Sequence, residues 1–222
     1  EKVKVIHIAG TSGKGSTATF ISKLLQAHGF RTGLTLSPHI NDIRERVQIN
    51  NRLINRQVFA QYFNEILPIF QEVEISKYSS LSYFEMIICL AYYTFWKEKT
   101  DYTVIETGLG GTYDATNCVS NPEKVCVITR IGYDHIKILG DSIEEITNNK
   151  VGIIRKYQHT IFLSQDIPNS IIKNKIDKED STFTEVKIEE WIDNDDNLIV
   201  KNNKLIFSNL PDYQKENLSM AI

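Results

Sequence analysis

The sequence has no apolar run near the roughly 20 residues that a helix needs to cross a bilayer, and it does not open on a basic-then-apolar signal segment. It also has no excess of cations, because 25 Lys and Arg residues stand against 28 Asp and Glu residues, for a formal net charge of -3. Such a chain is not expected to use a membrane or a nucleic acid as its main partner. The cytoplasm is the expected compartment.

Cysteine is scarce, with only Cys89, Cys118 and Cys126 in the chain. No two of them stand at a metal-binding spacing such as C-x-x-C, and an odd count without a secretion signal argues against a disulfide framework. We interpret all three as buried or neutral thiols.

Length and composition indicate one ordinary globular domain. The chain has 222 residues, of which 41% are hydrophobic and 24% are charged, so one large α/β domain can have a sizeable core. The sequence opens on a strand without a methionine and stops within what resembles the first turns of a helix. We therefore expect residues 1–222 to be one domain cut from a longer protein.

Apolar runs of strand length alternate with segments of helical periodicity. This alternation, with helices between the strands, predicts an α/β fold: a doubly wound, mostly parallel sheet flanked by helices, with ligands bound beyond the carboxyl ends of its strands. Pro68 is expected to end or bend its helix, and a small hairpin is expected at 198–207. The expected strands are residues 3–9, 31–36, 101–106, 124–129 and 159–163, and the expected helices are residues 16–28, 56–70 and 81–99.

A glycine-rich string lies between the first expected strand and the first expected helix, which is the context of a phosphate-binding P-loop. Its glycines let backbone N–H groups converge on phosphate oxygens, Lys14 adds a full positive charge, and the Ser16 hydroxyl can take a metal ion. The string departs from the standard G-x-x-x-x-G-K-[ST] pattern, and the simpler alternative is a turn that only caps the helix. The residues of the loop are Gly10, Thr11, Ser12, Gly13, Lys14, Gly15, Ser16 and Thr17.

Several further motifs follow the loop in a fixed order, and together they resemble the folylpolyglutamate synthase and dihydrofolate synthase branch of the Mur ligase superfamily. The resemblance is close from about residue 5 to residue 156 and loose beyond it. The motifs are HIAGTSGKGST at 7–17, SPH at 37–39, RERVQIN at 44–50, SYFE at 82–85, ETGLGG at 106–111 with DATN at 114–117, GYDH at 132–135, and KVGII at 150–154.

The resemblance implies an ATP-dependent ligase that joins L-glutamate to dihydropteroate, to a tetrahydrofolate-type polyglutamate, or to both, through an acyl phosphate. Residues 1–222 would be its ATP-binding domain, without the C-terminal glutamate-ligase domain. We therefore expect the chain alone to bind nucleotide weakly and to have little or no turnover. The family is generally monomeric, and a monomer is expected here.

The resemblance also implies two Mg²⁺ ions beside ATP. Ser16, Ser37 and Glu106 would hold the first ion, while Glu106, His135 and Lys150 would serve the second, with Lys150 converted to a carbamate by CO₂. Partial burial should lower the pKa of Lys150 and make its neutral amine available for that reaction. The residues expected to act in catalysis are Lys14, Glu106, His135 and Lys150.

The match is weaker at the substrate and adenine positions. Gln214 and Asn217 resemble the adenine-contacting motif, and Arg44, Arg46, Tyr83 and Phe84 either contact the pterin and benzoate parts of the substrate or only pack. The family usually has asparagine, arginine and histidine where this chain has Ser12, Thr112 and Tyr213.

Two other functions fit parts of the pattern. A ligase of peptidoglycan precursors shares the loop, the glutamate and the modified lysine, although the motif at 37–39 argues against it. The second alternative is a nucleotide-binding module without catalysis. Protection from heat unfolding by dihydropteroate, but not by a UDP-muramyl precursor, would distinguish the folate-type ligase from the ligase of peptidoglycan precursors.

Overall fold

An eight-stranded sheet forms the centre of the molecule. The computed structural model describes residues 4–74, 80–191, 198–200, 203–205 and 210–222. The strand order is β4-β3-β2-β5-β1-β6-β7-β8. Strands β2, β5, β1, β6, β7 and β8 are parallel to one another, whereas β3 and β4 form an antiparallel edge next to β2. The strands are β1 Lys4–Ala9, β2 Thr32–Thr35, β3 Gln48–Ile49, β4 Arg52–Leu53, β5 Tyr102–Glu106, β6 Val125–Ile128, β7 His159–Leu163 and β8 Thr182–Val186. The predicted doubly wound, mostly parallel sheet is confirmed.

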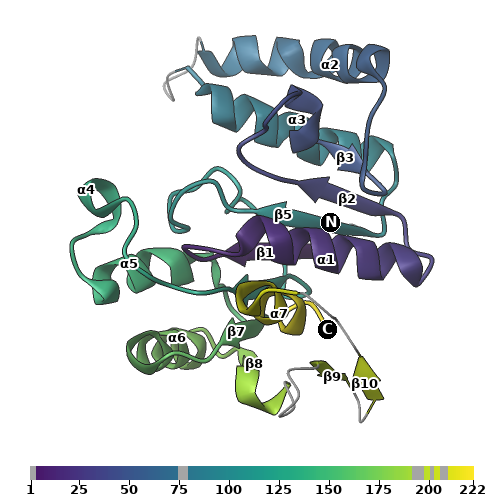
Figure 1. Ribbon diagram of the computed structural model, residues 1–222. Helices are drawn as coiled ribbons and strands as arrows, with labels where there is room; N and C mark the ends of the chain where they lie inside the picture. Colours follow the sequence, from purple (N-terminus) through teal and green to yellow (C-terminus); the bar gives the residue numbers. More distant parts are fainter. Residues whose placement is uncertain (1–3, 75–79, 192–197, 201–202, 206–209) are drawn as a thin grey trace.

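Helices cover both faces of this sheet (Figure 1). The α-helices are α1 Lys14–Ala27, α2 Arg56–Glu74, α3 Tyr83–Lys97, α4 Ile136–Leu139, α5 Ile143–Lys150, α6 Asp166–Lys178 and α7 Asp212–Ser219, with short 3₁₀ turns at Ile43–Arg46, Val151–Ile153 and Ile188–Glu190. No helix in the described part of the chain is long and apolar enough to cross a membrane.

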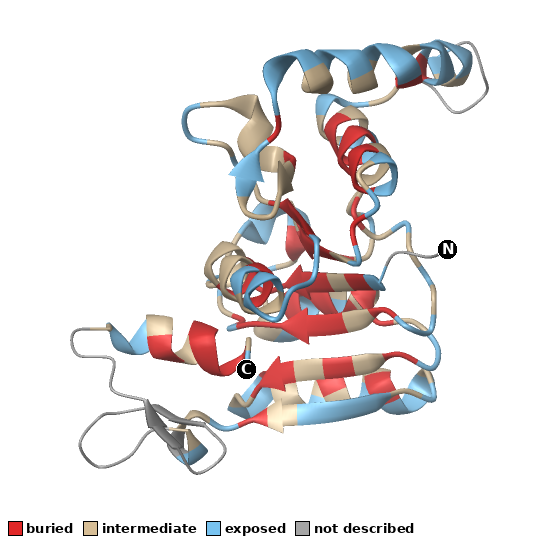
Figure 2. Cartoon of the chain, turned by 90° about the vertical axis from the view of Figure 1, so that its right-hand side faces the viewer, coloured by how far each residue is buried: buried red, intermediate tan, exposed pale blue. Residues whose placement is uncertain are grey.

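The apolar side chains of the central strands pack on both faces, as a parallel sheet requires. Ile8 packs with Ile21 of α1 on one face, whereas Ala9 packs with Ile146 of α5 and Ile176 of α6 on the other. A separate cluster joins β5 to Phe95 of α3. Figure 2 shows the inner strands mostly in the colour of buried residues.

The connection between β5 and β6 corrects one expectation. Residues 107–124 contain no helix but a series of turns, and they cross β1 because β1 lies between β5 and β6 in the sheet. The segment holds Gly108, Gly110 and Gly111 together with several Asn and Asp residues, which favour turns over helix. One face of β1 is therefore covered by a loop at His7, between the places where Val5 and Ala9 pack on helices.

Other differences have local causes. α2 continues through Pro68 to Glu74, because Ile66 and Phe70 on either side of the proline are buried against α3. The α6 and β8 elements were not predicted. The hairpin is confirmed as β9 Leu198–Val200 and β10 Asn203–Leu205.

The interpretation of the three cysteines as buried or neutral thiols is confirmed. Cys126 is buried, but Cys89 and Cys118 are exposed, and all three are free. Burial of the sulfur raises the pKa of all three thiols, that of Cys126 to about 11, so they are neutral near pH 7.

Candidate functional site

The glycine-rich loop lies at the carboxyl end of β1, where the strand order reverses, and it leads directly into α1. Gly13 is the residue before α1 and has φ +85°, a left-handed conformation that glycine adopts without cost. The first-turn amides of α1 have no partner within the helix, so they can donate to an anion.

The end of β6 fixes the first part of the loop. The amides of Thr11 and Ser12 both donate to the Arg130 carbonyl, at 2.8 and 3.3 Å, and the Thr129 hydroxyl donates to the Ser12 carbonyl at 2.7 Å. Because these two amides are already paired, it is the amides from Gly13 onward that remain able to donate to an anion at the loop.

Two lysines reach the loop. Lys14 Nζ donates to the carbonyls of Gly10 and Thr11, both at 3.1 Å. Lys150, the last residue of α5, is buried, and its Nζ donates to the same Gly10 carbonyl at 2.8 Å. Burial, followed by the positive charge of Lys14, lowers the pKa of Lys150 to about 8, although Asp134 acts in the opposite direction.

Glu106 is the buried carboxylate of the site, at the carboxyl end of β5. Its Oε2 accepts a 2.8 Å hydrogen bond from the Ser37 amide. Burial raises the pKa of Glu106, while the Ser37 amide and the cations Lys14 and Arg46 oppose that rise. A Cβ on Gly15 would lie 3.4 Å from both carboxylate oxygens, so the first turn of α1 passes directly beside this charge.

The α7 helix lies against the loop. The Asn217 side chain contacts Gly13, where a Cβ would lie 2.1 Å from its Oδ1, and the Asn217 carbonyl accepts from the Thr17 hydroxyl at 3.4 Å. Gln214 Nε2 lies 3.5 Å from the Ser16 hydroxyl.

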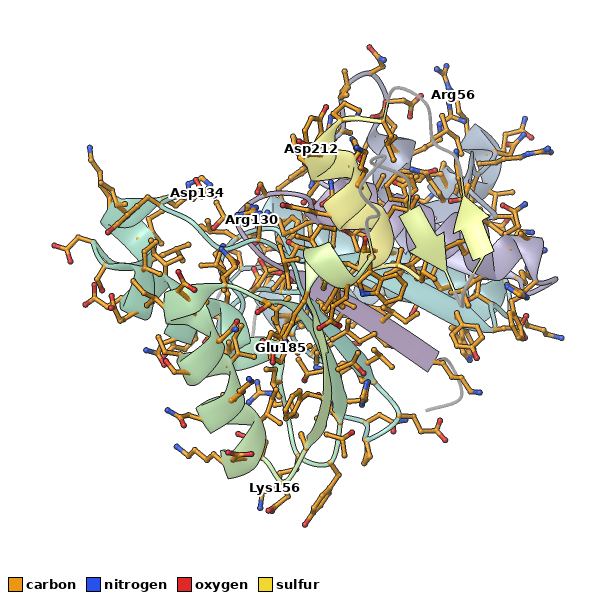
Figure 3. The ribbon with its side chains drawn as sticks, turned by 60° about the horizontal axis from the view of Figure 1, so that its bottom comes forward. Arg56, Arg130, Asp134, Lys156, Glu185 and Asp212 are labelled. Carbon is orange, nitrogen blue, oxygen red and sulfur yellow. The ribbon has the colours of Figure 1, made fainter. Side chains whose placement is uncertain are left out.

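An ion pair ties α7 to the end of β6. Arg130 Nε donates to Glu216 at 3.0 Å, and Figure 3 labels Arg130 together with Asp212, the first residue of α7. Gln214 and Asn217 thus stand at the phosphate loop although about 200 residues separate them from it in sequence.

His135 stands apart from these groups. It precedes α4 with φ 46°, its side chain is about half exposed, and its Nε2 lies 3.4 Å from Asp134 Oδ1. Within the described part of the chain, no hydrogen bond or ion pair joins His135 to Glu106 or Lys150.

A pocket of about 400 Å³ opens beside Glu106. The residues that line it are Ser37, Pro38, Arg46, Phe84, Gly108, Leu109 and Asp114. The Arg46 guanidinium lies 5.9 Å from the ring centre of Phe84 and 6.0 Å from that of Tyr83, whose own side chain is exposed. Asp114 is a pocket residue that we did not predict, although its position in the segment after β5 was a usable signal.

Arg44 does not line this pocket. Its guanidinium is paired with Asp42 at 2.7 Å and donates to the Ile54 carbonyl at 2.9 Å, so its donors serve its own loop. Of the departures from the family pattern, Thr112 donates its hydroxyl to the Asn149 carbonyl at 2.9 Å, next to Lys150, and Tyr213 is exposed. A larger hollow of about 1160 Å³, lined by Val5, Trp96 and Cys118 among others, lies at the opposite end of β1.

The residues present fit a bound cation. Within the described ranges, no three His, Cys, Asp or Glu side chains gather, so a magnesium site would depend on Glu106 with hydroxyl and lysine-derived ligands. A buried carboxylate with a raised pKa is stabilised when a divalent ion comes next to it. Ser37, whose amide contacts Glu106, and Ser16, which follows Gly15 in the chain, each carry a hydroxyl oxygen of the kind Mg²⁺ prefers.

Comparisons with known proteins find relatives in sequence and in fold. The family profile described as Mur ligase middle domain matches residues 8–221. A folylpolyglutamate synthase of Arabidopsis thaliana is 42% identical over 154 residues, which cover 69% of this chain and 27% of the plant protein. The mitochondrial folylpolyglutamate synthase of Bos taurus is 36% identical over 178 residues, which cover 79% of this chain and 30% of the bovine protein. The chain thus spans less than a third of the length of these relatives.

A solved structure gives the same result for the fold. A folylpolyglutamate synthase (FPGS) in an FPGS-AMPPCP-folate complex superposes with a TM-score of 0.84 and 27% identity, covering 100% of this chain and 57% of that one.

Proposed function

The chain belongs to the Mur ligase family through its middle domain, and on that premise we propose that it forms the ATP-binding part of a ligase that joins L-glutamate to dihydropteroate, a folate polyglutamate, or both. The observation that carries this proposal is the position of Glu106. It is a buried carboxylate between the phosphate loop and a pocket that contains an arginine and an aromatic ring. The relatives named above are folylpolyglutamate synthases, and one related complex contains both AMPPCP and folate.

The proposed reaction has two steps. A carboxylate oxygen of the folate-type substrate bonds to the γ-phosphorus of ATP as the bond to the bridging oxygen breaks and ADP leaves. The glutamate amine then bonds to the acyl carbon, the bond from that carbon to the phosphate oxygen breaks, and phosphate leaves while the nitrogen releases one proton to solvent. Lys14 and the first amides of α1 would bind the phosphates, and Gln214 and Asn217 would contact the adenine.

Two Mg²⁺ ions are part of the proposal, and when bound they supply positive charge between two anionic reactants. Ser16, Ser37 and Glu106 would hold one ion. Glu106, His135 and carbamylated Lys150 would hold the other, which requires His135 to approach from its half-exposed position.

The environment of Lys150 supports its modification. Because its pKa is lowered to about 8 from 10.5, Lys150 carries far more neutral amine near pH 7.4 than an ordinary lysine does. That amine bonds to the carbon of CO₂ and releases one proton, leaving an anionic carbamate. The new charge would lie beside Lys14 and next to the Gly10 carbonyl.

The substrate pocket supports a folate-type ligand. The Arg46 guanidinium can bind a carboxylate or the face of an aromatic ring, and Phe84 can stack on an aromatic heterocycle. Tyr83 extends the same surface outward. Arg44 would act indirectly, by holding the loop that carries Arg46.

The remaining proposals concern the whole chain. Residues 1–222 would act as one ATP-binding domain and would be monomeric. A cytoplasmic location stays a prediction, because one relative is named as mitochondrial.

Ligand-dependent unfolding tests the proposal. ATP with Mg²⁺, and dihydropteroate or a reduced folate added with it, should each raise the unfolding midpoint, since a ligand at 100 times its Kd stabilises by about 2.7 kcal/mol. A UDP-muramyl precursor should have no effect. Protection by the muramyl precursor, or no protection by any pterin compound in the presence of ATP and Mg²⁺, would contradict the folate assignment.

A further inference from the structure

A histidine occupies the middle of the central strand. His7 of β1 pairs with Ile105 of β5 and Cys126 of β6, and it is 1% exposed. Its side chain shares a face with Val5 and Ala9, which is the face opposite α1. At this point the covering element is not a helix but the turn-rich segment 107–117 that also forms one wall of the substrate pocket.

Hydrogen bonds connect His7 to that wall. His7 Nε2 lies 2.8 Å from the Thr116 hydroxyl and 3.0 Å from the Thr107 hydroxyl. The Thr116 hydroxyl and amide both donate to Asp114 Oδ1, and the Leu109 amide donates to Asp114 Oδ2 at 2.8 Å. Asp114 and Leu109 are both pocket residues.

The chemistry of these groups gives the chain of bonds a direction. A carboxylate only accepts, so the Thr116 hydroxyl must use its proton for Asp114. Thr116 can then only accept from the imidazole, which places the proton of His7 on Nε2. Burial, with the nearby charge of Lys124, holds the pKa of His7 well below its ordinary value, so the ring stays neutral and keeps this donor.

We infer that His7 is a positioning residue for the substrate pocket: through Thr116 it fixes the carboxylate of Asp114, so that the remaining acceptor sites of Asp114 face the pterin part of the substrate. His7 is buried and does not line the pocket itself. The inference rests on the proposed function, because it assigns the pocket a pterin ligand. It gives the buried histidine a role that packing alone would not require, since a leucine or methionine would fill a β-strand interior without a polar partner.

The test compares two substitutions of His7 in the same chain. Gln places an amide N–H near the position of Nε2, whereas Leu offers no donor. Titration calorimetry would measure dihydropteroate affinity in the presence of ATP and Mg²⁺, and ATP affinity separately. We expect His7→Leu to weaken dihydropteroate binding about tenfold while ATP binding changes less than about twofold, and His7→Gln to recover most of the loss. His28→Leu, at an exposed position after α1, is the matched control and should change neither affinity.

Thr116→Val is the second variant, and it removes the relay hydroxyl without altering His7. It should reproduce the selective loss, and in an Asp114→Ala background neither His7→Leu nor Thr116→Val should weaken pterin binding further. Equal losses for ATP and dihydropteroate, or no loss for either, would overturn the inference while leaving the ligase proposal in place. If the unsubstituted chain binds ATP but no pterin compound, the proposed function fails and this inference fails with it.

Discussion

Lys14 and Lys150 direct their ammonium groups at one backbone carbonyl, that of Gly10, with Nζ–O distances of 3.1 and 2.8 Å. Two cations that share one acceptor repel each other, and this repulsion adds to burial in lowering the pKa of Lys150. Binding of polyphosphate, or conversion of Lys150 to an anion, would each remove the conflict. The arrangement is therefore that of a site prepared for added negative charge.

Removal of the Lys150 charge should stabilise the protein near neutral pH. Between pH 8 and 10.5 the unfolded chain keeps a proton that folded Lys150 has lost, so this group makes stability rise with pH across that window. Lys150→Met should accordingly raise the free energy of unfolding by about 1 to 3 kcal/mol at pH 7 in CO₂-free buffer, and by less at pH 10.

The exposed Lys156, labelled in Figure 3, offers the control. Lys156→Met should leave the free energy of unfolding unchanged at both pH values. Urea denaturation at the two pH values measures the difference. A Lys150→Met protein that is less stable at pH 7 would show that the bond to Gly10 outweighs the charge.

Glu106→Gln should separate stability from metal binding. Because burial raises the pKa of Glu106, stability from this group is present at low pH and is lost as pH rises from 4.5 through the raised value. The Glu106→Gln variant should therefore be as stable as the parent or more stable at pH 7. Its free energy of unfolding should also change less with pH on the acid side. It should also lose the Mg²⁺-dependent part of ATP affinity, by about tenfold or more.

The control for that experiment is Glu123→Gln, at an exposed position before β6. Calorimetric titration of ATP with and without Mg²⁺ measures the effect. If Glu106→Gln binds MgATP as tightly as the parent, Glu106 does not hold the metal.

The placement of the glycine-rich loop and of Glu106 at strand ends could be predicted because both signals are local. A buried apolar run followed by glycines and a lysine fixes a strand end, and Glu106 ends another run that must lie beside it in a parallel sheet. The start of α3 could also be predicted, because Ser82 and Glu85 form a reciprocal capping box there.

The sequence could not predict the side-chain contacts that depend on loop geometry or on the packing of distant segments. The pairing of Arg44 with Asp42 is decided by loop geometry, although both residues are close in sequence. The link from His7 to Thr116 spans 109 positions, and it exists because a loop crosses β1 where we expected a helix. The contact of Asn217 with Gly13 likewise follows from the placement of α7.

Gly13→Ala should damage both the fold and nucleotide binding. The residue has φ +85°, and a Cβ would lie 2.1 Å from Asn217 Oδ1, so the substitution adds a clash to backbone strain. Gly29 provides a matched control because its φ is +89° and nothing lies within 4 Å of a Cβ there. Gly29→Ala should lose about 1 to 2 kcal/mol of stability from strain alone.

Gly13→Ala should lose about 1 to 3 kcal/mol more than Gly29→Ala and should weaken ATP binding, because Asn217 must move. Urea denaturation and nucleotide titration on both proteins give the comparison. Equal effects of the two substitutions would mean that α7 does not press on the loop.

Arg46 and Arg44, two residues apart, should differ in what they contribute. Arg46 lines the pocket over two aromatic rings, so Arg46→Gln should weaken binding of a folate-type ligand about tenfold while ATP affinity stays near the parent value. Arg44 instead holds the pKa of Asp42 well below its usual range by hydrogen bonding to it, so their pairing contributes stability above the ordinary pKa of Asp42 that is lost as pH falls. Arg44→Gln should therefore lower stability at neutral pH. It should reduce folate affinity only as far as the loop that carries Arg46 becomes less ordered.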